Sequence, residues 1–460
     1  MSNCCACVYH KEMDPPSSAG AALSPQHPYP SRWLVWSAMC LLASAQMMSF
    51  IDRFVLSLLI TPIKQALALS DFQIGLLLGP AFAICFAVFG VPMGWLADRK
   101  NRTTIIASGI VLWSAMTAAC GLARSFGALF VARIGVGLGE AALNPSVVSL
   151  VSDYFPRDHR SRAMGFYMTS AFIGAGAAYI VGGQAVQIIA SWPPLSVPLI
   201  GELMAWQTAF IVISAPGFII AALIFLTPEP PRRGTPDTAV SAMSFSQAHR
   251  HFSLHWRSYT CVFIGMAGTT AISAASFWSP ALFERTWGWN VDRTGLVIGF
   301  VILLGGIPGA NLGGWLSDRF TRHRADGPLL TCLIGSIVMF PGFALYPLMP
   351  SGELAAALMW LAFFGLAMCA GVSPNAVAAI TPSGLKAQAA GWFFMTMNLL
   401  GLFLGPPLVG FIADLIAGPA GLRYAMAISF FIFGAGTIGV LRWGLKPYRL
   451  SAQETAQNET

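Results

Sequence analysis

The stretch Gly90–Arg102, which reads GVPMGWLADRKNR, returns about 220 residues later within Gly305–Arg322, which reads GGIPGANLGGWLSDRFTR. Both copies contain Gly-Trp-Leu, a small residue, Asp and Arg in the same register. Each copy ends a long apolar run and begins a basic loop. A six-residue pattern with Trp, Asp and Arg is unlikely to recur by chance in a chain that is only 10% charged. We therefore interpret the two copies as an internal duplication.

The composition predicts a membrane protein. The 460 residues are 56% hydrophobic, and the mean hydropathy is +0.66. Apolar runs of about 20 residues, long enough to cross a bilayer, recur along nearly the whole chain. Backbone groups in lipid must be paired internally, so these runs are expected to be helices. They are continuous rather than alternating, which excludes a β-barrel.

Twelve spans are expected, and they divide into two matching halves. Lys386 and Gly391-Trp392 open the eleventh span much as Arg160 and Gly165-Phe166 open the fifth. Two six-span halves in the same orientation imply a pseudo-two-fold axis along the membrane normal. The expected spans are 33–62, 71–96, 103–123, 126–152, 161–189 and 206–227, then 257–285, 292–317, 328–349, 353–380, 386–415 and 422–445.

The remaining segments are expected to be tails and a linker. We predict a disordered N-terminal tail at 1–32, a six-helix bundle at 33–227, a linker at 228–256, a second six-helix bundle at 257–445, and a C-terminal tail at 446–460 that is disordered from Ser451. The N-terminal segment does not have the pattern of a signal peptide. Its Cys4, Cys5 and Cys7 have no His/Cys set at metal spacing beside them, and no metal or cofactor is expected.

Lys and Arg gather in one set of loops, which predicts that both termini and the linker are cytoplasmic. The opposite loops hold only Lys64, Arg124, Arg285, Arg293 and Arg423. We therefore expect a multi-pass protein of the plasma membrane, of the bacterial inner-membrane type. Its partner is the bilayer, not nucleic acid, and it is expected to be monomeric.

At this point the chain resembles the major facilitator superfamily over about 33–445, through Gly94–Arg102 between the second and third spans. Within that superfamily it looks most like the Spinster group. Three segments support the narrower resemblance: Ile51-Asp52-Arg53, Arg133 to Ala142 with Asn144-Pro145, and Ser152 to Ala163. The resemblance implies an all-α fold of twelve transmembrane helices in two pseudo-symmetric bundles. It also implies transport by alternating access, and eukaryotic members of the group move lysophospholipids and sphingoid phosphates.

Four ionisable residues lie inside predicted spans: Asp52, Arg53, Arg133 and Glu140. A charge at the bilayer centre costs about 2.5–3.5 kcal/mol, so such residues are functional candidates. Asp52 and Glu140 are candidate proton-coupling groups, with the proton as the coupling ion. Arg53 and Arg133 could neutralise them or hold an anionic head group. The alternatives are a purely structural ion-pair network and, for Arg133, a position near the outer interface.

Polar residues elsewhere complete the candidate substrate site. Asn144 continues the stripe of Arg133 and Glu140 on the fourth span. The second half offers no equivalent of Asp52 or Glu140 inside its spans, so its candidates are Asn375, Asn398 and Trp392. Gly401 and Gly405-Pro406-Pro407 are expected to kink the eleventh span.

The repeated stretch is expected to form a cytoplasmic latch. By resemblance, Gly94 allows a tight crossing, and Asp98 pairs with Arg99, Arg102 or Arg162 and with the N-terminal end of the eleventh span. Asp153 is a further candidate, and Asp318 with Arg319 forms the weaker copy in the second half. The alternative is a topological anchor, because insertion alone favours basic residues there.

We therefore predict a proton-coupled secondary transporter of a lipid-like amphipathic anion, such as a lysophospholipid or sphingoid phosphate. One alternative is proton symport of a small organic anion, such as a sugar acid or an aromatic acid. Another is a membrane sensor that does not transport. The chain lacks a phosphate-binding loop, a nucleophile elbow and a zinc-protease motif, which argues against ATP drive and against an enzyme.

Overall fold

The computed structural model describes residues 31–97, 99–193, 195–197, 201–232, 245–382, 385–416, 418 and 420–459. Within these residues, twelve helical spans are long and apolar enough to cross a membrane. This confirms the predicted all-α membrane fold. Apart from Ser31 and Arg32, the expected N-terminal tail, with Cys4, Cys5 and Cys7, lies outside the described residues.

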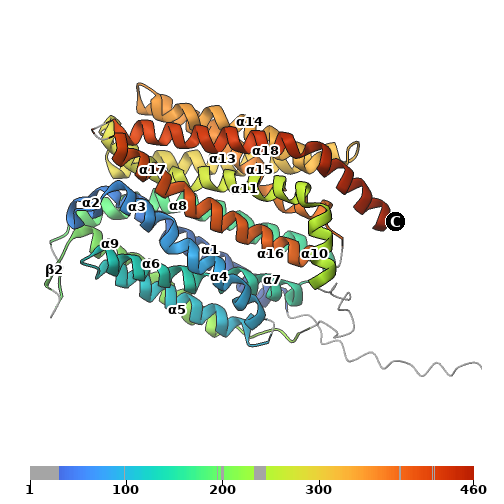
Figure 1. Ribbon diagram of the computed structural model, residues 1–460. Helices are drawn as coiled ribbons and strands as arrows, with labels where there is room; N and C mark the ends of the chain where they lie inside the picture. Colours follow the sequence, from blue (N-terminus) through green and yellow to red (C-terminus); the bar gives the residue numbers. More distant parts are fainter. Residues whose placement is uncertain are drawn as a thin grey trace, which may run out of the picture.

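The first half forms one layer of the molecule, drawn in blue to green in Figure 1. Its elements are α1 (Arg32–Leu58), α2 (Ile60–Leu67), α3 (Asp71–Leu78), α4 (Pro80–Ala97), α5 (Arg102–Gly121), α6 (Phe126–Glu140), α7 (Leu143–Tyr154), α8 (Arg157–Ala190), β1 (Leu195–Val197), β2 (Gly201–Leu203) and α9 (Ala205–Phe225).

The second half lies against the first and is drawn in yellow to red in Figure 1. Its elements are α10 (Phe245–Leu254), α11 (Trp256–Ala275), η2 (Ser276–Trp278), α12 (Ser279–Trp287), α13 (Val291–Thr321), α14 (Gly327–Leu345), η3 (Tyr346–Leu348), α15 (Gly352–Ala379), α16 (Lys386–Thr396), the π-helical segment η5 (Met397–Leu402), α17 (Phe403–Ile416) and α18 (Gly421–Glu459).

We call the end of the bundle where α1 begins and α18 ends the terminal end. The opposite end, where α2 and α12 lie, is called the clasp end. The halves meet along two seams, α8 on α13 and α3 on α17.

Proline breaks the fourth span where a candidate residue sits. α6 ends at Glu140 and α7 begins at Leu143, so one span is built from two helices. Pro145 has no backbone N–H to donate to the carbonyl one turn earlier, which accounts for the break. Glu140 therefore occupies a helix end inside the span. In the eleventh span the regular α-helix gives way to η5 directly before Gly405-Pro406-Pro407, where a kink was expected.

Three segments differ from the sequence-based expectation. Disorder after Ser451 is wrong, because α18 continues as a helix to Glu459. Ser451, Ala452 and Thr455 are buried and supply the packing that a polar sequence does not suggest. The linker contains a helix, α10, and an antiparallel hairpin of β1 with β2 lies between the fifth and sixth spans.

Candidate functional site

A buried ion pair joins the first and fourth spans. Arg53 of α1 donates from Nε (2.8 Å) and Nη2 (2.6 Å) to Oε2 of Glu140, and the Ser49 hydroxyl donates to the same oxygen at 2.6 Å. Glu140 is buried, whereas the Arg53 side chain keeps 18% of its surface exposed. The other carboxylate oxygen of Glu140, Oε1, has no hydrogen-bond partner among the described residues. The cation of this pair is therefore the member within reach of a ligand.

Three phenylalanines surround the guanidinium of Arg53. Its Cζ lies 5.3 Å from the ring centre of Phe50, 4.5 Å from that of Phe82 and 4.9 Å from that of Phe86. Ring faces attract a cation without neutralising it. Arg53 is thus held in an aromatic box with one carboxylate, an arrangement that suits an anion with an apolar part.

Asp52 is buried beside this pair and is not bonded to it. Neither carboxylate oxygen of Asp52 has a hydrogen-bond partner in the described part of the chain. Arg133 is also buried, and its Nη1 donates to the backbone oxygen of Asp52 at 3.2 Å, not to the carboxylate. A buried carboxylate without a hydrogen-bond partner is costly, which makes Asp52 a candidate functional group. Arg133 is therefore buried against Asp52 and is not exposed on the surface of the described structure.

The other polar candidates divide between the halves. The Tyr167 hydroxyl lies 2.8 Å from Asn144 Oδ1 and 2.7 Å from Gln46 Oε1, which places Asn144 in a buried network of the first half. In the second half Asn375 and Trp392 are exposed. Asn398 lies in η5 and donates to the Phe394 carbonyl at 2.8 Å. The described contacts do not bring these three residues to Arg53.

The contacts that the structure describes for Arg102 lie within its own half of the molecule. Arg102 is buried and binds Asp153 of its own half, and it also donates from Nε to Glu229 at 2.7 Å and from Nη2 to the Pro230 carbonyl at 3.1 Å. Its backbone N–H donates to Glu229 as well, at 2.8 Å. Arg102 therefore ties α5 and α7 to the segment after α9. Glu229 was not foreseen, and Asp98 lies outside the described residues.

The remaining latch candidates lie at the surface of the terminal end. Arg99 stacks on Trp95 at 4.1 Å and Arg319 on Trp315 at 5.9 Å, so the repeat forms the same Arg–Trp contact in both halves. Asp318 and Arg162 are exposed, and Gly94 faces Pro145.

In the second half another acid has a role like that of Asp153. The buried Asp326 accepts from Arg324 (3.0 Å) and from Arg449 of α18 (2.7 Å). Burial alone would raise the pKa of Asp326, but the hydrogen bonds and charges of the two arginines outweigh burial and lower that pKa.

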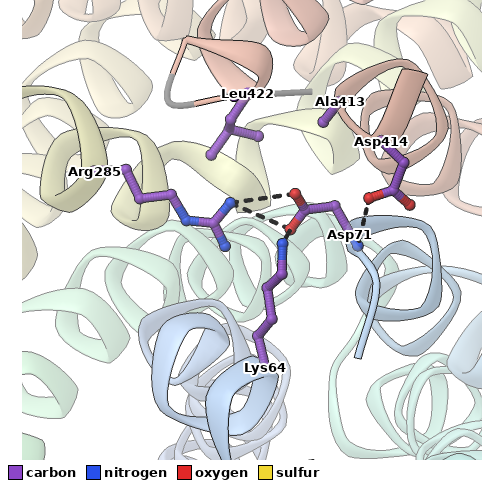
Figure 2. Close-up of a pocket in the computed structure, with 7 residues that line it drawn as sticks. Lys64, Asp71, Arg285, Ala413, Asp414 and Leu422 are labelled. Atoms are coloured by element: carbon purple, nitrogen blue, oxygen red, sulfur yellow. Dashed lines mark hydrogen bonds and ion pairs between the residues drawn. The ribbon is translucent and has the colours of Figure 1, made fainter. Parts of the chain in front are cut away.

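A clasp of four residues, Lys64, Asp71, Arg285 and Asp414, joins the halves at the clasp end. Asp71 pairs with Lys64 of its own half at 2.7 Å and with Arg285 of the second half at 3.2 Å. Asp414 of α17 accepts from the backbone N–H groups of Asp71 (3.0 Å) and Phe72 (2.8 Å). These residues border a cavity of about 490 Å³ (Figure 2). Nearby, the Thr61 hydroxyl donates to Glu284 at 2.6 Å.

The two seams are tight at the clasp end and loose at the terminal end. A Cβ on Gly75 would lie 2.7 Å from the Pro406 carbonyl oxygen, and one on Gly183 would lie 2.9 Å from that of Val291. Only glycine permits such an approach without a shift of the backbone. Toward the terminal end, a Cβ on Gly90, Gly165, Gly314 or Gly391 would meet no described atom within 4 Å. Within the described residues, the closest approaches of α3 to α17 and of α8 to α13 therefore lie at the clasp end.

The sequence reading missed the clasp. Lys64 and Arg285 were noted only as rare cations on a sparsely charged side, and Glu284 was given no role. Asp71 and Asp414 each lie next to the end of an apolar span, on the side of the membrane with few cations. That position was the sequence signal that could have indicated the clasp.

The sequence of this chain matches a family model and several known proteins. The family model of the Major Facilitator Superfamily matches residues 42–406. An MFS-type efflux pump of Mycolicibacterium smegmatis is 28% identical over 84% of this chain and 86% of its own length. Protein spinster of Drosophila melanogaster is 26% identical over 72% of this chain, a match that spans 55% of that protein. A probable L-galactonate transporter of Escherichia coli is 25% identical, covering 93% of this chain and 96% of that protein.

A solved structure is similar to this chain over most of its length. It is a bacterial homolog to the human lysosomal transporter Spinster in an inward-facing and unoccupied conformation, with a TM-score of 0.76, 25% sequence identity, and coverage of 93% of this chain and 99% of that one.

Proposed function

The chain belongs to the Major Facilitator Superfamily, and from this premise we propose that it is a proton-coupled transporter of an amphipathic, lipid-like anion. Its relatives are transporters, not enzymes. The observation that supports the proposal most is the pair of Arg53 and Glu140 inside a box of phenylalanines, beside the unpaired carboxyl of Asp52.

The pair links proton binding to anion binding. While Glu140 is ionised, two donors of Arg53 are occupied by its Oε2. A proton on Glu140 removes the negative charge and frees Arg53 to bind an anion. By reciprocity, an anion on Arg53 favours a proton on Glu140. Positive coupling of this kind makes the proton and the anion cross together, so the expected mode is symport.

The surroundings of Arg53 favour an amphipathic substrate over a small acid. Phe50, Phe82 and Phe86 offer apolar surface directly at the cation. A small, strongly hydrated acid would need further donors or a second cation in the other half. Among the described residues, the second-half spans bury no Lys or Arg. Lysophospholipids and sphingoid phosphates combine one anionic head group with a long apolar chain and fit this arrangement.

The second candidate is a small organic anion, such as a sugar acid. It is supported by the similarity to a probable L-galactonate transporter over nearly the whole chain. In this alternative Asn375 and Asn398 would bind the hydroxyl groups of the substrate.

The basic loops support an orientation with the terminal end in the cytoplasm, in a membrane of the bacterial inner-membrane type. In that orientation the closed clasp faces outward, which agrees with the inward-facing conformation of the similar solved structure. Alternating access then requires the clasp to open when the terminal end closes.

Uptake into proteoliposomes under an imposed pH gradient tests the proposal. Wild type is compared with Glu140→Gln and Asp52→Asn, using radiolabelled lysophospholipid and a sugar acid in parallel. We expect lysophospholipid uptake to follow the gradient in wild type, and Glu140→Gln to transport without responding to it. Glu353→Gln, which alters an exposed carboxylate paired with Arg293, is the matched control and is expected to behave like wild type.

Three results would contradict the proposal in different ways. Uptake of the sugar acid alone would establish the second candidate. Gradient-driven uptake that is unchanged in both Glu140→Gln and Asp52→Asn would show that the pair of Arg53 and Glu140 is structural. Binding of either substrate without any flux would instead identify a sensor.

A further inference from the structure

We propose that the terminal end carries a binding site for an anionic phospholipid of the surrounding bilayer, built where α10, α11 and α18 meet. The site consists of Trp256, Arg257, Trp443 and Lys446, with Arg442 at its edge. It is independent of the transport proposal and contains no residue of the Arg53–Glu140 pair.

Two exposed tryptophans from different helices form the floor of this site. Trp256 begins α11, Trp443 lies in α18, and their ring centres are 6.1 Å apart. Each ring is about half exposed, at 51% and 50%. Tryptophan is enriched where a helix leaves the hydrocarbon region, because its ring is apolar and its N–H is polar. The paired rings therefore mark the level of the head groups.

Cations converge on these rings. The guanidinium of Arg257 lies 5.5 Å from the ring centre of Trp256. Trp443, Lys446 and Leu450 follow a spacing of three and four residues and therefore share one face of α18. All three are exposed, as is Arg442. Basic groups gathered between transmembrane helices at one membrane surface are the arrangement that binds anionic lipid head groups.

The depth along α18 fits a head group. Lys446 follows Gly421 by 25 positions, which is about 37 Å of helix, so it lies beyond a hydrocarbon core of about 30 Å. Leu254 and Leu450 are 70% and 67% exposed at this same end, where they can contact acyl chains. α10 and the last turns of α18 lie at the same end of the bundle in Figure 1.

The nearby groups with other partners define the limits of the site. Arg449 is held by Asp326 at 2.7 Å. Ser451 lies 2.9 Å from Nδ1 of His255, and Glu454 lies 3.9 Å from Nε2 of the same ring. These contacts around α10 and α18 include two acids. Asp326 binds Arg449, and Glu454 lies toward His255. The charge complementarity of Arg257, Arg442 and Lys446 therefore favours a phospholipid phosphate.

Native mass spectrometry of the full chain, released from nanodiscs with equal phosphatidylglycerol and phosphatidylcholine, tests the site. Wild type is expected to retain phosphatidylglycerol preferentially. Arg257→Gln/Lys446→Gln is expected to lower that retention about 25-fold, because each of the two basic residues contributes roughly a fivefold factor near an anionic lipid. The matched control is Lys100→Gln/Arg322→Gln, which removes two exposed cations elsewhere at the terminal end.

Each outcome decides the proposal. Equal loss of phosphatidylglycerol in Arg257→Gln/Lys446→Gln (the patch variant) and in the control would show a general charge effect and overturn the proposal. Equal retention of the two lipids by wild type would also overturn it. Displacement of the lipid by soluble glycerol phosphate would assign the cations to free phosphate esters instead. If the patch variant does not purify as a single species, the second measurement is the retention of phosphatidylglycerol by wild type at rising salt concentration. Retention that does not change with salt would overturn the proposal.

Discussion

Asp414 caps α3 from the other half of the molecule: its carboxylate accepts the backbone N–H groups of Asp71 and Phe72 at 3.0 and 2.8 Å. A carboxylate at a helix N-terminus satisfies unpaired donors and interacts favourably with the helix dipole. Here the cap and the helix belong to different halves, so the interaction exists only while the clasp end is closed. The cap therefore contributes to the balance between the two conformations rather than to the stability of either half alone.

Replacing this cap is expected to shift the conformational balance. Asp414→Ala removes an N-cap contribution of about 1 kcal/mol, which corresponds to a roughly fivefold larger open population at the clasp end. Spin labels at Gln65 and Ala420, on opposite halves of a variant without other cysteines, report the distance by pulsed electron resonance. Glu353→Ala, which removes an exposed acid paired with Arg293 within the second half, is the control. An unchanged distance distribution in Asp414→Ala would show that the clasp does not contribute to closure of this end.

The seam between α8 and α13 offers a steric test on a single helix. In Gly183→Val the new Cβ would lie 2.9 Å from the Val291 carbonyl oxygen, so the seam must widen, whereas Gly165→Val on the same helix enters open space. Overpacking of this kind costs about 1–3 kcal/mol. We expect Gly183→Val to lower the melting temperature and slow transport, and Gly165→Val to keep the wild-type melting temperature. Similar melting temperatures for the two variants would show that the seam is not tight.

Asp326 makes the stability of the second half depend on pH in the acid range. Because Arg324 and Arg449 lower its pKa in the folded state, the carboxylate stabilises the fold above its ordinary pKa of 3.8. That contribution is lost as the pH falls from 3.8 through the lowered pKa. Asp326→Asn should reduce the melting temperature at pH 7 and flatten its dependence on pH in this acid range. A variant whose acid profile overlays that of wild type would exclude Asp326 as a source of the acid sensitivity.

The twelve spans, the two halves and the buried charges of the first half were predictable, because each depends on local hydrophobicity or on a charge inside an apolar run. The partners were harder to predict. Arg53 and Glu140 are 87 positions apart, and their contact depends on the rotation of two helices about their axes, which hydrophobic periodicity constrains weakly.

The clasp and the helical C-terminus were missed for a related reason. Asp71 and Asp414 are unremarkable acids at span ends until α3 and α17 meet across the two halves. The sequence after Ser451 is polar and reads as a tail, and it is helical here because His255, Ser258 and α18 pack against one another. Both features are tertiary contacts that no local pattern records.

Arg102 is expected to tolerate no replacement, even by lysine. Its guanidinium is buried and reaches Asp153, Glu229 and the Pro230 carbonyl in three directions. A lysine keeps the charge but has a single ammonium group and cannot replace this planar fork. Arg102→Lys would leave at least one buried carboxylate poorly paired, and we expect the free energy of unfolding to fall by about 3 kcal/mol. Arg99→Lys, at an exposed position that stacks on Trp95 and donates to its carbonyl at 3.4 Å, should change it by less than about 0.5 kcal/mol. Denaturant unfolding of both variants in detergent measures the difference, and equal small effects would mean that Arg102 acts only as a topological anchor.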